Sequence, residues 1–253
     1  MDFQAQQKLN ILLVGDDCVD IYDYGTVDRI SPEAPVPIFK YSYKESRPGM
    51  AGNVRKNLEA LGCTVNYLHG NTSTKTRLID IRSKQQLLRI DGDIMSKPIE
   101  FDTAIPNVYD AIVISDYNKG TISYDLLKNI INSVYCPVFI DTKKTDLGSI
   151  NGAFIKINQS EAARATSLPN PEWLITTLGE NGALWNSYSF DADPVEVADV
   201  CGAGDTFLAA MVYDYLINKD IKSAIKFAIK ASAITVKHLG VYAPTIGEIL
   251  WQN

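Results

Sequence analysis

The chain has 253 residues, 46% of them hydrophobic, which is enough to bury the core of one large domain. Its net charge of −6 argues against a nucleic-acid or membrane-surface partner, because either partner would favour a concentrated basic face. We therefore expect a single domain over residues 1–253 that binds a small ligand.

Cysteine spacing and the N-terminal stretch indicate the compartment. The cysteines lie far apart, without a CxxC pair or nearby histidines, so they indicate neither a zinc site nor a disulfide framework: Cys18, Cys63, Cys136 and Cys201. The apolar run before Gly15 is too short for a secretion signal or a membrane span. We therefore expect a reducing, cytoplasmic location.

Apolar, β-branched runs alternate with helical patterns along the chain, which is typical of parallel strands joined by crossover helices. The sequence therefore predicts a layered α/β sheet. The predicted buried strands cover residues 11–15, 111–116, 137–141, 153–158 and 173–179.

Helices and a polar flap are predicted between and after these strands. A helix over 53–61 follows the glycine-bearing loop SRPGMAG, and two helical patterns lie within 206–240. The stretch 72–93 alternates like two short strands but is too polar for the sheet core, so we expect a flap there, with a further strand around 36–44.

Short polar residues end several of the predicted strands, at the sheet edge where parallel α/β folds bind ligands. They are Asp16, Asp116, Asp141 and Asn158. These residues are candidates for a site, and the alternative interpretation is that they form turns and helix caps.

The stretch ADVCGAGDTF suggests chemistry. Gly202, Ala203 and Gly204 stand where a helix begins, and free backbone N–H groups at such an end attract a phosphoryl group. Asp205 would repel phosphate but is suited to accept the proton of an attacking hydroxyl, which makes it a candidate general base. The alternative is an ordinary first-turn acid that stabilises the helix dipole.

Two other phosphate-binding motifs are excluded by their spacing. The chain has no GxxxxGK[ST], and only one glycine follows the first predicted strand where a GxGxxG fingerprint would stand. Neither a P-loop kinase nor a dinucleotide-binding protein is indicated.

Four segments resemble the ribokinase-like (PfkB) carbohydrate kinases in that family's order. DVCGAGD resembles D-T-x-G-A-G-D, with Val200 in place of threonine, and Gly49 to Asn53 resembles G-G-x-x-N, with Met50 in place of glycine. INQSE resembles N-x-x-E, and TLGENGA resembles T-x-G-x-x-G. The resemblance implies a three-layer α/β/α fold with a mostly parallel central sheet and a small β flap, or lid, and an enzyme that uses ATP and Mg²⁺.

One branch of the family is more similar still. SPEAPVP, KQQLLRIDGD and VISDYNKG resemble the kinase domain of the D-glycero-β-D-manno-heptose 7-phosphate kinases of lipopolysaccharide biosynthesis. This resemblance implies phosphorylation of the anomeric hydroxyl to give the 1,7-bisphosphate. Alternatives are a kinase for another sugar or sugar phosphate, and a weakly catalytic sugar- or nucleotide-binding regulator.

The resemblance also implies roles for individual residues. The sugar would contact Asp20, Gly49 and Asn53. The substrate phosphate would bind Lys75, Arg77 and Arg89, whose alternative interpretation is solvated charge on exposed strands. The nucleotide would contact Lys143, Asn158, Thr177, Gly179 and Gly182. Magnesium would be held, through water, by Asn158 and Glu161.

The chain departs from the family in being shorter. Segments between Leu68 and Thr74, and again after Glu161, are contracted, and no nucleotidyltransferase domain accompanies the kinase segment. Both contractions spare the motifs above, so we expect a shortened but active kinase. Because flap strands in this family often pair across a dimer, a homodimer through the flap is also expected.

Overall fold

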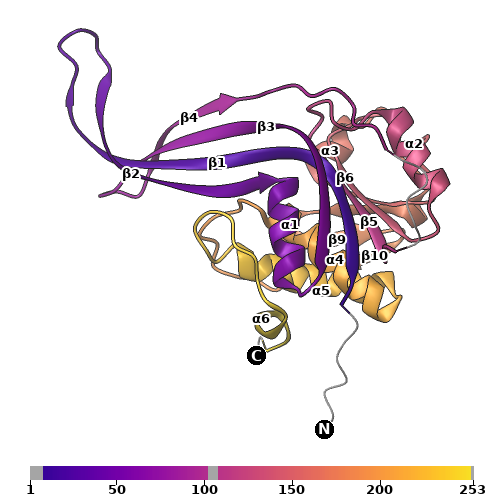
Figure 1. Ribbon diagram of the computed structural model, residues 1–253. Helices are drawn as coiled ribbons and strands as arrows, with labels where there is room; N and C mark the ends of the chain where they lie inside the picture. The colour runs from indigo at the N-terminus through magenta and orange to yellow at the C-terminus, as the bar shows by residue number, and fades with distance from the viewer. Residues whose placement is uncertain (1–7, 102–107, 252–253) are drawn as a thin grey trace.

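The computed structural model describes residues 8–101 and 108–251 (Figure 1). A ten-stranded sheet runs in the order β10-β9-β8-β7-β6-β5-β1-β3-β4, and β2 pairs with β1 outside this path. The strands are β1 (Asn10–Ile30), β2 (Pro37–Met50), β3 (Thr64–Asp80), β4 (Gln86–Gly92), β5 (Ala111–Asp116), β6 (Val138–Thr142), β7 (Phe154–Asn158), β8 (Leu174–Thr177), β9 (Ala183–Trp185) and β10 (Tyr188–Phe190). The pairings from β3 through β8 are parallel, and β2, β4, β9 and β10 are antiparallel to their neighbours.

Two apolar layers cover the sheet, because successive side chains of its strands point to opposite faces. Ile11 and Leu13 face one core, which contains α1 (Ala51–Ala60), α4 (Ala203–Asn218), α5 (Ile221–Thr235) and α6 (Ile246–Leu250). Leu12 and Val14 face the other core, against α2 (Tyr124–Ser133) and part of α3 (Gln159–Arg164). The three-layer α/β/α arrangement confirms the expected fold class.

The lid is a direct continuation of the central sheet. β5 pairs with β1 only from Ile11 to Gly15, and from Asp17 onward β2 lies antiparallel to β1 on that side. β3 accompanies β1 along both parts, and β4 borders β3. In Figure 1, β1 and β2 extend away from the body as a long hairpin.

The first predicted strand was therefore too short, because β1 does not stop at Gly15 but runs to Ile30. Its second half alternates buried and half-buried positions instead of forming a continuous apolar run, since it leaves the covered sheet for the lid. The contraction expected after Leu68 has a simple consequence: β3 passes straight from the sheet into the lid. The flap predicted over 72–93 corresponds to the end of β3 and to β4.

Met50 joins the lid to α1 in a backbone conformation that favours glycine. Its φ of 50° and ψ of −131° place it in the left-handed half of backbone space, and its side chain is buried. A non-glycine residue there stores strain on the order of 1–3 kcal/mol. This explains why the related motif carries glycine at this position.

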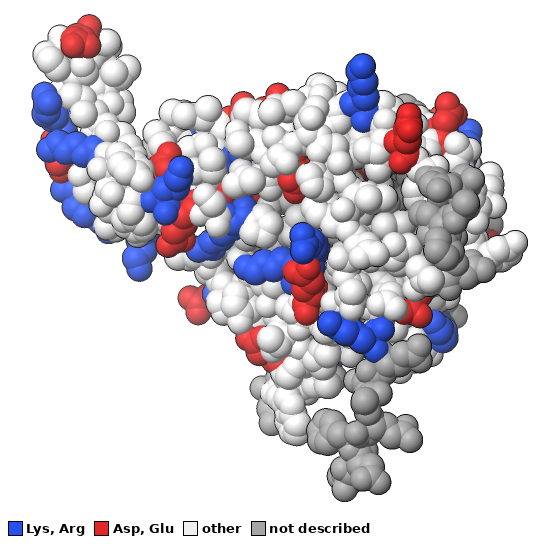
Figure 2. All heavy atoms as spheres, viewed as in Figure 1, with Lys and Arg blue, Asp and Glu red and all other residues white. Residues whose placement is uncertain are grey.

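The surface carries both signs of charge. Figure 2 shows basic side chains along the projecting hairpin, with acidic side chains among them and at its tip. Asp28, for example, pairs with Lys40 and with Arg82. Within the described parts of the chain, no helix is long and apolar enough to cross a membrane.

Candidate active site

Asp205 lies in the first turn of α4, where two side chains from other elements hold its carboxylate. The Asn53 amide, on α1, donates to Oδ2 at 2.8 Å, and the Tyr117 hydroxyl, after β5, donates to Oδ1 at 2.9 Å. Asn57 orients this region by donating to the Asn53 carbonyl and accepting from the hydroxyl of Thr206. One donor therefore fixes each oxygen of the carboxylate.

Burial changes the acidity of this carboxylate. Asp205 is 6% exposed, and burial raises its pKa from 3.8 to about 6. The hydrogen bonds from Asn53 and Tyr117 act in the opposite direction, while the charge of Asp141 raises the pKa further. A carboxylate with such a pKa is ionised at neutral pH yet basic enough to take a proton.

The glycine turn before Asp205 leaves space that side chains would fill. Gly202 has a φ of 79°, and a Cβ there would lie 2.7 Å from the Asn53 amide nitrogen. The backbone N–H of Ala203 donates to the carbonyl of Val200, so this amide stabilises the turn. The other amides of the first helical turn have no acceptors within the helix and are available to an anion.

Lys156 approaches the same turn from β7. It is 3% exposed, its Nζ lies 2.7 Å from Oδ2 of Asp141, and a Cβ at Gly204 would lie 2.9 Å from that nitrogen. Lys156 was not among the residues predicted from the sequence. The available signal was a lysine inside the otherwise apolar run FIKIN, since a buried lysine needs a partner.

Tyr117, also not predicted, is placed by two aspartates: Asp16, which lies within β1 and not at its end as predicted, and Asp116, which ends β5. The Asp16 carboxylate, 1% exposed, accepts backbone N–H groups from Tyr117 at 2.8 Å, Lys119 at 3.0 Å and Thr121 at 3.3 Å. Asp116 accepts from the backbone of Asn118 and from the hydroxyl of Thr142. Both aspartates therefore build the loop after β5, and the turn-forming interpretation holds for them.

On the lid, Asp20, Gly49 and Arg77 lie together. Arg77 donates to Oδ1 of Asp20 at 2.6 Å, and a Cβ at Gly49 would collide with the same carboxylate. Lys75 lies on the same side of β3, with Nζ 5.7 Å from the centre of the Tyr117 ring. Arg89, by contrast, is on the exposed strand β4 and pairs with Asp91. The structure thus brings Lys75 and Arg77 to the inner face of the lid and leaves Arg89 solvated.

The predicted nucleotide-side residues meet at the ends of β6, β7 and β8. Lys143 pairs with Glu161. Burial lowers the pKa of Lys143, but the negative charges of Asp141 and Glu161 raise it by more, so its pKa lies above the usual value. Asn158 and Glu161 form a capping box at the start of α3. Thr177 is the cross-strand neighbour of Asn158. Two predicted glycines flank the turn after Thr177, each with positive φ: Gly179 and Gly182.

The residues present fit a hydrated magnesium ion. Among residues 8–101 and 108–251, no three His, Cys, Asp or Glu side chains form a direct metal cluster. One oxygen of Asp141 is buried without a hydrogen-bond partner in the described structure, and the Glu161 carboxylate lies beside it across Lys143. Such acceptors suit the water shell that Mg²⁺ usually retains.

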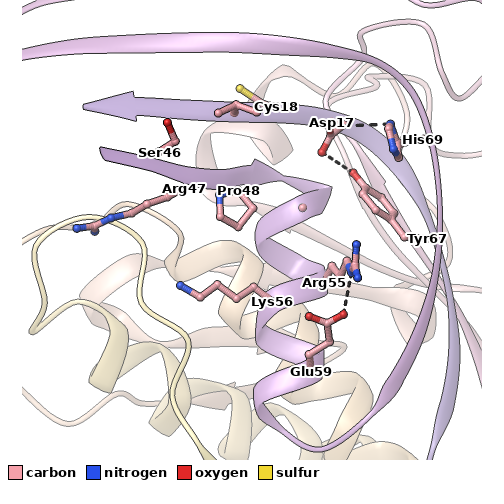
Figure 3. A pocket seen from close by; sticks show the side chains of 12 residues that line it. Asp17, Cys18, Ser46, Arg47, Pro48, Arg55, Lys56, Glu59, Tyr67 and His69 are labelled. Atoms are coloured by element: carbon pink, nitrogen blue, oxygen red, sulfur yellow. Dashed lines mark hydrogen bonds and ion pairs between the residues drawn. The ribbon is translucent and has the colours of Figure 1, made fainter. Parts of the chain in front are cut away.

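A pocket of about 460 Å³ is lined by residues of β1, β2, β3 and α1 (Figure 3). Its charged groups largely satisfy one another, because Arg55 pairs with Glu59 and Asp17 accepts from the hydroxyl of Tyr67. The residues that line the pocket include neither Asp205 nor its partners Asn53 and Tyr117, so the pocket is distinct from the site around Asp205.

Solved structures show the same fold. The structure of ribokinase from Arabidopsis thaliana with ribose and ATP matches with a TM-score of 0.70 at 16% identity, covering 96% of this chain and 98% of that one. A ribokinase from Cryptococcus neoformans in complex with ADP gives a TM-score of 0.68 at 14% identity, covering 97% of this chain and all of that one.

Sequence comparison assigns the family. Residues 50–246 match the family described as pfkB family carbohydrate kinase. The bifunctional proteins HldE of Campylobacter curvus and of a Nitratiruptor species are each 33% identical over 302 aligned residues, covering 96% of this chain and 64% of the relative. The alignment is longer than the chain, which agrees with the contractions, and the chain spans just under two thirds of each relative's length. The chain belongs to the pfkB family of carbohydrate kinases.

Proposed function

We propose that the chain is an ATP-dependent sugar kinase that phosphorylates the anomeric hydroxyl of D-glycero-β-D-manno-heptose 7-phosphate, giving the 1,7-bisphosphate. The observation that carries the proposal is the buried carboxylate of Asp205, held by Asn53 beside the glycine turn of α4. A protein that only bound sugar or nucleotide would gain nothing from a carboxylate beside a phosphate-binding turn.

The reaction follows from this arrangement. The acceptor oxygen forms a bond to the γ-phosphorus of ATP, the bond from that phosphorus to the β–γ bridging oxygen breaks, and ADP leaves. Asp205 takes the proton of the attacking hydroxyl. The backbone N–H groups of Gly202 and Gly204, together with Lys156, stabilise the charge on the transferring group, while the Ala203 amide is held by the Val200 carbonyl.

The nucleotide side has the groups that ATP requires. We assign Lys143 to the ATP phosphates, and Thr177, Gly179 and Gly182 to the nucleotide. Magnesium, when bound, neutralises phosphate charge, and Asn158 and Glu161 would hold its water shell.

The choice of a heptose phosphate has two supports. The segments SPEAPVP and KQQLLRIDGD resemble the heptose 7-phosphate kinases, and the curated relatives above are HldE proteins. On the lid, we assign Asp20 to the sugar hydroxyls and assign Lys75 and Arg77 to the phosphate, which needs cations that a plain sugar does not.

The test is ADP release from ATP with the heptose 7-phosphate, the same heptose without phosphate, ribose and fructose 6-phosphate. We expect the highest kcat/KM with the heptose 7-phosphate. Asp205→Asn should reduce kcat by roughly 10²- to 10⁴-fold, the usual contribution of a general base. The control Asp214→Asn removes another buried carboxylate of α4, one that bonds to Asn218, and should leave kcat within a few-fold of the parent.

Two outcomes would redirect the assignment. Higher turnover with another acceptor would transfer the proposal to that sugar. Tight ATP binding with no ADP release from any acceptor would favour a regulator over an enzyme.

A further inference from the structure

Tyr117 holds a place in the site that the family motifs do not explain. Its hydroxyl donates to Asp205 across 88 positions of sequence, and its backbone is fixed by the carboxylate of Asp16, which lies within β1 just after the pairing with β5 ends. Lys75 of the lid and Lys143 after β6 lie against its ring, with Nζ atoms 5.7 Å and 5.1 Å from the ring centre. Backbone and ring contacts therefore fix the direction of the hydroxyl.

We propose that Tyr117 is a positioning residue, whose hydroxyl fixes the plane of the Asp205 carboxylate so that its remaining lone pairs face the acceptor hydroxyl. The inference rests on the proposed role of Asp205 as the base. With Asn53 as the only donor, one oxygen would be held, but the carboxylate group as a whole could still pivot about that hydrogen bond. Two donors, one on each oxygen, define the plane and leave further acceptor capacity on both oxygens.

Other groups around Asp205 contribute charge but do not replace this bond. Asp141 and Lys143 face it from the end of β6, Lys156 from β7, and Asn53 from α1. The Tyr117 hydroxyl stabilises the ionised carboxylate and so holds its pKa lower than burial alone would. Burial and the charge of Asp205 keep the pKa of Tyr117 itself well above its usual value, so the hydroxyl remains a donor.

The test is Tyr117→Phe, which removes the hydroxyl and keeps the ring. We expect the acid limb of the pH profile of kcat/KM to move up by about one pH unit, and kcat to fall roughly tenfold, since a hydrogen bond to a charged group is lost. The KM for ATP should stay within about twofold.

Tyr124→Phe is the matched control. Tyr124 also has a hydrogen-bonded hydroxyl, which accepts from the backbone of Asp146, and also carries a lysine, Lys144, 5.1 Å from its ring centre. Its hydroxyl does not bond to Asp205, so the acid limb should not move. An unshifted acid limb in Tyr117→Phe, or an equal shift in Tyr124→Phe, would overturn the proposal.

Two further measurements keep the inference testable. If Tyr117→Phe does not fold, 3-fluorotyrosine at position 117 preserves the shape and gives a stronger donor, so the acid limb should move down, and an unmoved limb would refute the role. If no acceptor supports turnover in the parent, titration of the Asp205 carboxyl by ¹³C NMR still measures the shift between parent and variant. A failure of the kinase assignment is thereby distinguished from a failure of the positioning role.

Discussion

Replacing Asp205 by asparagine should change how the stability of the fold depends on pH. The pKa of this carboxyl is raised from 3.8 to about 6, chiefly by burial, so the native state binds its proton more tightly than the unfolded chain does. As pH rises from about 4 to about 6, the parent therefore loses stability. One pKa unit corresponds to about 1.4 kcal/mol, so a shift of about two units amounts to about 3 kcal/mol across this window.

Asparagine does not titrate, so the variant does not share this loss. It keeps only one acceptor oxygen, which leaves either the Asn53 amide or the Tyr117 hydroxyl without its acceptor, at a cost of about 1–2 kcal/mol at every pH. The free energy of unfolding of the variant minus that of the parent should thus be negative near pH 4. It should rise by up to about 3 kcal/mol by pH 7.

Urea unfolding of both proteins at pH 4, 5, 6 and 7, followed by fluorescence, measures this difference directly. Because other titrating groups are common to both proteins, their contributions largely cancel in the difference. A difference that stays flat from pH 4 to pH 7, or that falls, would refute the raised pKa and with it the physical basis for Asp205 as a base.

Other perturbations test the turn, the lid and the assembly. Gly202→Ala should destabilise the fold by about 1–3 kcal/mol and lower kcat, because its φ of 79° disfavours alanine and the new Cβ would displace Asn53. Gly62→Ala, at a φ of 86° with open space around it, should lose stability in urea but keep its kcat. Arg77→Met should raise KM for a sugar phosphate more than for the free sugar, and Arg89→Met should have the smaller effect; equal effects of Arg77→Met on both sugars would contradict the phosphate-binding role. Sedimentation at micromolar concentration should show a dimer, because the edge strand β4 is exposed along its length, and a purely monomeric sample would contradict this expectation.

The sheet was predictable where its strands are covered on both faces. The run from Ala111 to Asp116 is buried at every position, and such continuous apolar runs need no tertiary context to be recognised. The lid half of β1 was not predictable in the same way. Buried and half-buried positions alternate there among aspartates and tyrosines, and such polar and aromatic runs also occur in exposed loops.

The motifs predicted candidate site residues, but not the contacts between them. Asn53 and Asp205 come from two different motifs and hydrogen-bond to each other, and the bond from Tyr117 to Asp205 depends on the loop that Asp16 holds. Asn158 caps α3 through a capping box, as the turn-and-cap interpretation predicted. This structural role is compatible with the nucleotide contact that we propose for the same residue. Contacts between residues far apart in sequence depend on strand register, which local patterns do not specify.

Continuous strands attach the lid to the body. β1 and β3 run unbroken from the sheet into the lid, and their register shifts between Gly15 and Asp17, the point where β5 ends. A Cβ at Gly15 would collide with the carbonyl of Ser115 and lie 2.7 Å from the Cβ of Ala51, so this crossing has no room for a side chain. Asp20, the proposed sugar contact, lies five residues beyond Gly15 on β1, and α1 packs against Gly15 through Ala51. Bending of the paired strands at Gly15 would therefore move Asp20 relative to Asp205. Any movement of the lid relative to the body would therefore bend two hydrogen-bonded strands, rather than rotate a connecting loop.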